Sequence, residues 1–247
     1  MVQMEVFMER EIFTPNQSQA IVDAILKGYK SYLDERIEKR RTMHVSAGYA
    51  WTKANHIDDA LATANLNFID KFELKHAGQS WEFLEFNSEN QLLGRVCFVL
   101  KGLTRLRQVF PTAVKSGKGY LFDYAQINTS YLENLSRNTD ESTLFPVQME
   151  LFDDNLFELL NRSEQSINNF FFITYQADEL HHLTNIQVIM PDSRTGKLIE
   201  IQNLSTFIST SNVDFNDEKY QKLQGLSEID DVADFEIIPR LASEKEA

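Results

Sequence analysis

The clearest pattern in the chain is a helical repeat of apolar positions near its N-terminus. Apolar residues recur every three or four positions over residues 21–33, which is the spacing of one face of an α-helix. Thr14 is suited to cap this helix, and Pro15 is suited to its first position. Three consecutive cations at 39–41 suit the negative end of a helix dipole. We therefore predict a long helix over residues 14–41.

A period of two follows in the next part of the chain. Over residues 67–76, even positions that are mostly apolar alternate with odd positions that are often charged, as in a strand with one buried and one solvated face. Residues 81–86 read as a second strand, and the turn formers between the two favour a hairpin. We expect the face that carries Phe72 and Leu74 to be buried, together with the aromatic residues of the second strand.

The remaining pattern predicts an α+β protein. Residues 91–110 fit either one helix or a strand followed by a helix, and we expect a strand to about Lys101 and a helix to Pro111. Further expected elements are strands at 49–53, 120–124, 147–152 and 170–176, a hairpin of 184–190 with 198–202, and helices at 55–65, 156–160 and 214–225. The predicted fold is a mostly antiparallel or mixed sheet, flanked by a long N-terminal helix and shorter helices. We expect a single α+β domain over 1–247, with a sub-division near 123–145 as the alternative.

Composition limits the class of protein. The apolar fraction of 43% and the aromatic fraction of 11% are sufficient for a sizeable core. Cys97 is the only cysteine, so an internal disulfide and a cysteine-rich zinc site are excluded. The first ten residues do not resemble a secretory signal, and no apolar run approaches the length of a membrane span. These features predict a cytoplasmic protein with no membrane partner.

Charge is distributed unevenly along this acidic chain. The formal net charge is −13. Residues 1–122 carry a net charge of +2, whereas residues 123–247 carry −15. Residues 90–122 hold six cations and no acid, and these cations are Arg95, Lys101, Arg105, Arg107, Lys115 and Lys118. Such a basic band is a candidate surface for an anion such as a nucleic-acid backbone.

The charge pattern leads to two binding hypotheses. In the first, the N-terminal half contacts an anionic partner such as nucleic acid, and the candidate contacts are Lys53, Lys101, Arg105, Arg107, Lys115 and Lys118. In the second, the protein is an acidic regulator or inhibitor whose C-terminal half docks a basic protein. The cations at 39–41 fit either a helix end or a binding role.

A third hypothesis is enzymatic. Glu73-Leu74-Lys75 lies downstream of Asp58, and an acid followed by Glu-x-Lys on a strand is the minimal pattern of restriction-type nucleases. In that chemistry two carboxylates, here Asp58 and Glu73, hold Mg²⁺ while the lysine positions the attacking water. Glu73 and Lys75 share one strand face. The alternative is that Asp58 caps its helix and that Glu73 and Lys75 form a solvated face.

Other motifs are less specific. Residues 115–119 form a short basic glycine-rich loop that lacks the P-loop signature. Residues 178–182 offer four metal-ligand types without the spacing of a zinc site, so a turn is expected. Trp51 near His44 and His56 is either a stacking platform or a core residue. No cofactor is implied other than Mg²⁺ in the nuclease hypothesis.

Overall fold

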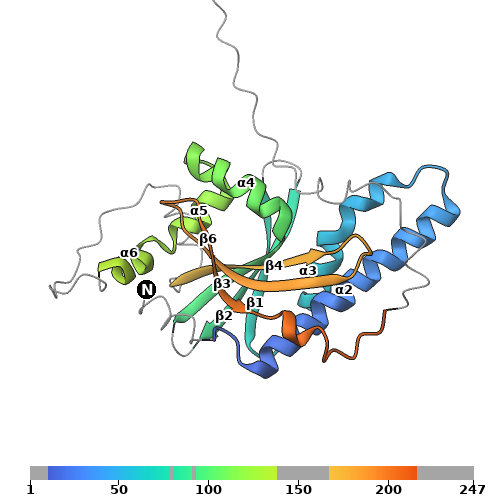
Figure 1. The fold of residues 1–247 in the computed structure, drawn as a ribbon, viewed down its shortest axis with the longest axis horizontal. Coiled ribbons are helices and arrows are strands. Elements are labelled where there is room, and N and C mark those ends of the chain that lie inside the picture. Colours follow the sequence, from blue (N-terminus) through green and yellow to red (C-terminus); the bar gives the residue numbers. More distant parts are fainter. Residues whose placement is uncertain (1–10, 78–80, 91–92, 138–166, 216–247) are drawn as a thin grey trace, which may run out of the picture.

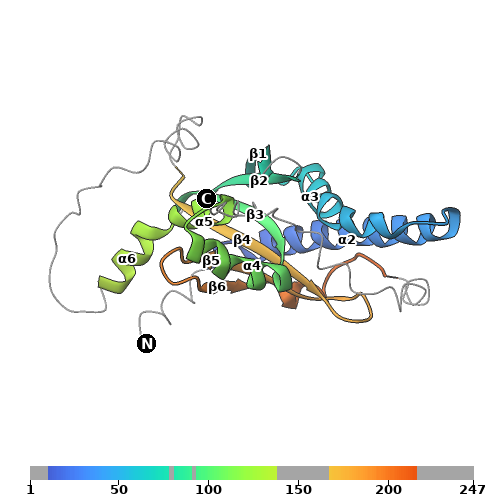
Figure 2. The same cartoon turned by 90° about the horizontal axis from the view of Figure 1, so that it is seen from above.

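The computed structural model describes residues 11–77, 81–90, 93–137 and 167–215. They form three layers, with a six-stranded sheet in the middle and helices on both faces (Figures 1 and 2). The strands follow one another in the order β1-β2-β3-β4-β5-β6. Their bounds are β1 Ile69–Ala77, β2 Trp81–Asn90, β3 Gly94–Gly102, β4 Asn169–Ala177, β5 Leu183–Pro191 and β6 Leu198–Asn203. The mixed sheet with its long N-terminal helix confirms the predicted α+β class.

Two antiparallel units meet at one parallel pair of strands. β1, β2 and β3 pair antiparallel, as do β4, β5 and β6. β3 and β4 are parallel, so the chain must cross from one end of the sheet to the other between them. The helices of this connection that lie within the described residues are α4 Leu103–Ser116, α5 Tyr120–Gln126 and α6 Thr129–Arg137. Each half of the chain thus contributes three strands to a single sheet.

The first helical layer is built by α2 (Pro15–Thr42) and α3 (Lys53–Thr63). Thr14 caps α2 through a capping box with Gln17, which satisfies backbone groups at the start of the helix. Gly28 lets the two helices approach closely, because a Cβ at this position would lie 2.5 Å from the backbone oxygen of His56. The apolar stripe of α2 packs on the sheet face that includes Phe86 and Phe98.

The second helical layer covers the opposite face. There α4 and α5 pack on Cys97, Phe170 and Phe172. The side chains of a strand alternate between its two faces, so neighbouring residues of β3 and β4 pack in different cores. The first core lies between the sheet and α2, and the second core lies between the sheet and the pair α4 and α5. None of the helices in the described part of the chain combines the length and apolar character that crossing a bilayer would require.

Three predictions about local structure are wrong. Residues 49–53 do not form a strand, because Ala47–Thr52 is a 3₁₀ helix that continues into α3. Residues 120–124 are helical in α5. Phe72 and Leu74 are 49% and 56% exposed, because they lie on the edge strand β1. The expected elements at 147–152 and 156–160, and nearly all of 214–225, lie outside the described residues.

Candidate functional site

The basic band folds largely into the amphipathic helix α4. Its apolar face consists of Leu103, Leu106, Phe110 and Ala113, all buried against the second core. The helix ends at Ser116 and is capped by Gly117, whose φ of 62° is left-handed and suits a residue without a Cβ. The band's remaining polar and charged positions on α4 therefore face away from the sheet.

The cations of the band have different environments. Arg107, Lys115 and Lys118 are exposed, and Arg105 is half-buried. Arg95 lies earlier, near the start of β3, and is half-buried. The structure therefore brings four of the six cations to α4 and the residues just after it.

Lys101 departs from the sequence-based expectation that it faces solvent. It is only 4% exposed, and its Nζ lies 5.1 Å from the ring centroid of Phe83 and 5.3 Å from that of Tyr120. β3 places Lys101 on the face that α5 covers, so its charge stacks on aromatic rings. Lys101 is consequently a core residue and not a surface contact for an anion.

The turn between β5 and β6 adds cations that the sequence pattern did not assign to this surface. A Cβ at Gly196 would lie 3.6 Å from the Cα of Pro111, so the turn lies directly against α4. Lys197 and Arg194 are both exposed. The hairpin was predicted, but its position beside α4 depends on the strand order, which local patterns do not encode.

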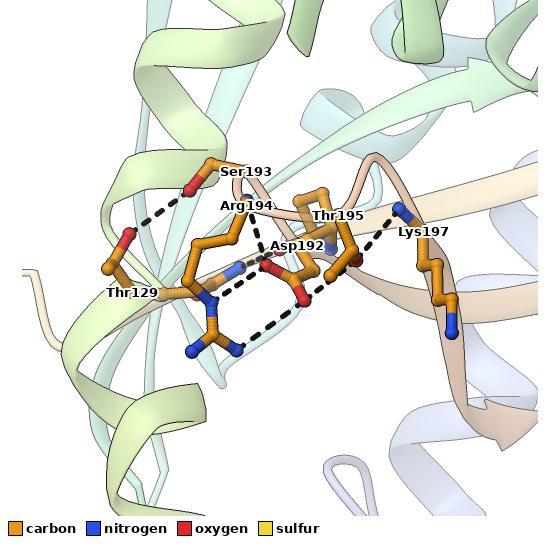
Figure 3. A network of polar contacts seen from close by, with 8 residues as sticks. Thr129, Asp192, Ser193, Arg194, Thr195 and Lys197 are labelled. Carbon is orange, nitrogen blue, oxygen red and sulfur yellow. Dashed lines mark hydrogen bonds and ion pairs between the residues drawn. The ribbon is translucent and has the colours of Figure 1, made fainter. Parts of the chain in front are cut away.

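Asp192 determines the conformation of this turn (Figure 3). Its Oδ1 accepts hydrogen bonds from the Arg194 backbone N–H at 2.9 Å and from Arg194 Nε at 3.2 Å. Its Oδ2 accepts one from Thr195 Oγ1 at 2.8 Å. Burial acts to raise the pKa of Asp192, but the hydrogen bonds from Arg194 and Thr195 outweigh it and lower the pKa below its ordinary value. Arg194 is thus paired with Asp192, whereas Lys197 projects beside the network.

We define the α4 basic surface as the solvent-facing cations of α4, the residue just beyond it and the neighbouring turn. Its members are Arg105, Arg107, Lys115, Lys118 and Lys197. No acidic residue occurs between Leu103, the first residue of α4, and Tyr120. A cluster of charges of one sign on the low-dielectric surface of a protein concentrates counter-ions of the opposite sign.

Lys53 does not belong to this surface. It is the first residue of α3, whose Ile57 and Leu61 pack with α2 on the sheet face opposite to α4. Trp51 is half-buried in the same region. His56 Nε2 lies 2.8 Å from Glu35 Oε2, so this histidine links α3 to α2.

The residues of the nuclease hypothesis are divided between the two faces of the sheet. Asp58 lies on α3, is 6% exposed, and accepts a hydrogen bond from the Leu84 backbone N–H at 3.0 Å through Oδ2. Glu73 points to the other face, towards the layer of α4 and α5. The structure therefore does not bring Asp58 and Glu73 to one ion. Within the described residues, no group of three or more His, Cys, Asp or Glu side chains is placed to hold a metal.

Glu73 and Lys75 instead belong to a compensated charge cluster on β1 and β2. Glu73 lies opposite Glu85 in the ladder, and Lys75 Nζ is 2.7 Å from Glu73 Oε2 and 3.8 Å from Glu85 Oε1. Hydrogen bonds from Lys71 and Lys75 lower the pKa of Glu73 to about 2. The buried Glu85 also accepts a hydrogen bond from the Tyr124 hydroxyl. This cluster joins α5 to the sheet.

The segment of residues 178–182 is a turn, as expected. Asp178 Oδ1 accepts hydrogen bonds from the backbone N–H groups of Leu180 at 2.9 Å and His182 at 2.8 Å. Its carboxylate therefore stabilises a local turn.

Comparison with known proteins adds no identification. Neither a family model, nor a curated protein, nor a solved structure matches this chain. Function is therefore inferred from the geometry of the α4 basic surface.

Proposed function

We propose that this protein binds a polyanion, specifically nucleic acid, through the α4 basic surface. The observation that carries the proposal is the set of exposed cations on α4 and the adjoining turn, without an acid in α4 itself. Lysine and arginine side chains bind phosphate oxygens irrespective of sequence and release the counter-ions condensed on the nucleic acid. A rigid helix and a turn held by Asp192 present these side chains in a fixed arrangement.

The distribution of charge supports the proposal despite the acidity of the whole protein. The described residues contain 18 Lys/Arg and 19 Asp/Glu, a net charge of −1. The other residues contain 6 Lys/Arg and 18 Asp/Glu, a net charge of −12. The three-layer body is therefore nearly neutral, and a local basic surface on it is not opposed by a large net charge of the body.

The proposal is tested by binding at different salt concentrations. A fluorescently labelled duplex of about two helical turns is titrated with the full chain, and the affinity is measured by anisotropy. Each phosphate contact contributes about −0.9 to the slope of log K against log salt, so four or five contacts predict a slope of about −4. A protein that does not bind at low salt, or binds with no salt dependence, contradicts the proposal.

A matched pair of variants locates the surface. Lys115→Ala/Lys118→Ala/Lys197→Ala removes three exposed cations and should reduce the magnitude of the slope by about 3. The control, Lys27→Ala/Arg40→Ala/Arg41→Ala, removes three exposed cations from α2 on the other layer. It should retain most of the wild-type slope. An equal loss in both variants would mean that binding depends on overall charge and not on this surface.

The acidic C-terminal half remains the basis of the alternative hypothesis of docking to a basic protein. Residues 138–166 and 216–247 carry −11 of its net charge of −15, and they lie outside the described residues. No contact in the described part of the chain favours that hypothesis over the first.

A further inference from the structure

The exposed face of α4 carries more than positive charge. Thr104, Arg107, Gln108, Thr112 and Lys115 lie at spacings of three, one, four and three residues, so they occupy neighbouring positions on one side of the helix. Arg107, Gln108, Thr112 and Lys115 are exposed, and Thr104 is half-buried. Arginine, glutamine and threonine are side chains that form hydrogen bonds or apolar contacts with base edges in the major groove.

The dimensions of α4 fit that groove. A helix of 14 residues is about 21 Å long, and the nine residues from Arg107 to Lys115 span about 12 Å of its axis. The major groove of B-DNA is about 12 Å wide and admits an α-helix. Lys118 follows the C-terminus of α4, and Lys197 lies on the turn beside it. Cations at such flanking positions are suited to the phosphates that border the groove.

The helix is also held firmly. Leu103, Leu106 and Phe110 are at most 2% exposed, and they anchor α4 to the second core. Arg105 Nη1 donates a hydrogen bond to Gln108 Oε1 at 3.4 Å, which orients the Gln108 amide. A helix that contacts base edges needs this kind of fixed support, because a small displacement of its side chains breaks hydrogen bonds to the bases.

In the described part of the chain, the α4 basic surface carries no exposed aromatic ring that could serve as a platform for single-stranded nucleic acid. Proteins that bind single strands stack bases on exposed aromatic rings. Near α4, Phe110 and Tyr124 are buried, and Tyr120 is half-buried and stacks on Phe83. Among the described residues, the large exposed hydrophobic side chains lie elsewhere, at Met43, Val45, Phe72, Leu74 and Leu180.

We infer that α4 enters the major groove of duplex DNA. In this arrangement Arg107 and Gln108 contact base edges, while Lys115, Lys118 and Lys197 contact phosphates. The inference rests on the proposed nucleic-acid binding and specifies its ligand. Duplex RNA is a poor alternative because its major groove is deep and narrow, and a helix cannot enter it.

The test compares ligands that differ only in groove geometry. Duplex DNA, duplex RNA of the same sequence and the single strands are titrated with the full chain at one moderate salt concentration. We expect duplex DNA to bind at least about tenfold more tightly than duplex RNA, because the RNA groove excludes the helix. Methyl green, a major-groove ligand, should compete with the protein, whereas netropsin, a minor-groove ligand, should not.

A charge-conserving variant separates base contacts from phosphate contacts. A pool of randomised duplexes is selected with the wild-type protein, and its enriched sequence is compared with a scrambled control. Arg107→Lys should lower the affinity for the enriched duplex by roughly 5- to 150-fold, which is the range expected for loss of one bidentate base contact. Because the positive charge is conserved, the loss on the scrambled duplex should be smaller, so the ratio of the two affinities should fall. Circular dichroism of the variant checks that α4 is intact.

The outcomes distinguish the two proposals. Salt-dependent binding with equal affinity for duplex DNA and duplex RNA, or competition by netropsin alone, would overturn the major-groove inference and leave nucleic-acid binding in place. An Arg107→Lys variant that behaves like the wild type on the enriched duplex would also overturn it. The absence of any binding at low salt would overturn both.

Discussion

Phe72 on β1 and Phe86 on β2 lie on the same face of the sheet and allow the energetic effect of burial to be measured with one kind of substitution. Phe72 and Phe86 are paired across the ladder, and their ring centroids are 6.1 Å apart. Phe86 is fully buried and stacks on Phe98 with centroids 5.4 Å apart. Phe72 is 49% exposed on the edge strand. The same change, Phe to Ala, should therefore have very different effects at neighbouring positions.

The expected magnitudes follow from the burial of each ring. Phe86→Ala leaves a cavity in the first core and should lower the free energy of unfolding by about 3–5 kcal/mol. Complete burial of a phenylalanine contributes about 1.5–3 kcal/mol, so the half-buried Phe72 contributes about 1 kcal/mol. Water can fill the space left by Phe72→Ala, so no cavity cost is added. The ratio of the two effects should be at least about three.

Urea unfolding, followed by the fluorescence of Trp51 and Trp81, measures both variants against the wild type. The midpoints should move while the slope m stays constant, because the same surface is exposed on unfolding. If Phe72→Ala were as destabilising as Phe86→Ala, the Phe72 side chain at the edge of the sheet would be covered in the folded protein. The assignment of β1 as an exposed edge would then be wrong.

Two further predictions concern buried polar groups. Asp192→Asn should lower the free energy of unfolding at neutral pH by about 1–3 kcal/mol, because hydrogen bonds to a charged carboxylate are lost. The pKa of Asp192 is lowered in the folded state, so its stabilisation is present above its unfolded pKa of about 3.9 and is lost as the pH falls through the folded value. In thermal melts between neutral and acidic pH, the melting temperatures of the wild type and Asp192→Asn should therefore converge in acid. The control Asp59→Asn, at an exposed position, should match the wild type throughout. A difference between wild type and Asp192→Asn that stays constant with pH would contradict this role of Asp192. Burial is the main cause that raises the pKa of the Cys97 thiol, and the nearby Glu85 carboxylate is the second. Cys97 should therefore react with a disulfide reagent roughly 10³-fold more slowly in the native protein than in concentrated urea. Comparable rates would mean that the second core is open to solvent.

Most of the regular elements could be predicted because their signals are local. The cap at Thr14 and the apolar spacing of α2 are contained in one stretch of sequence. The change from strand to helix near Lys101 was predicted in the same way, from a buried run followed by helical spacing. These predictions are confirmed by α2, β3 and α4.

Errors arose where packing between distant elements decides the structure. Residues 120–124 are rich in aromatic side chains, which favour strands only when they fit a half-buried sheet surface. Here Tyr120 stacks on Phe83 and Tyr124 stacks on Phe170, and a helix presents both rings to the sheet. The burial of Lys101 and the position of Lys197 beside α4 likewise depend on which strands are neighbours. The basic band was visible in the sequence, but its separation into surface and core cations was not.

The parallel junction of β3 and β4 has a consequence for how the chain reaches its fold. Val96 pairs with Asn169, whereas the pairs within each antiparallel unit join residues close in sequence. The β1–β3 meander and the β4–β6 meander each require only short loop closures, which are fast. Their docking requires closure of the long connection that contains α4, and pairing between such distant strands slows folding. The proposed binding helix therefore packs on both β3 and β4 only after the two halves have joined, and the turn that carries Lys197 reaches α4 in the same step.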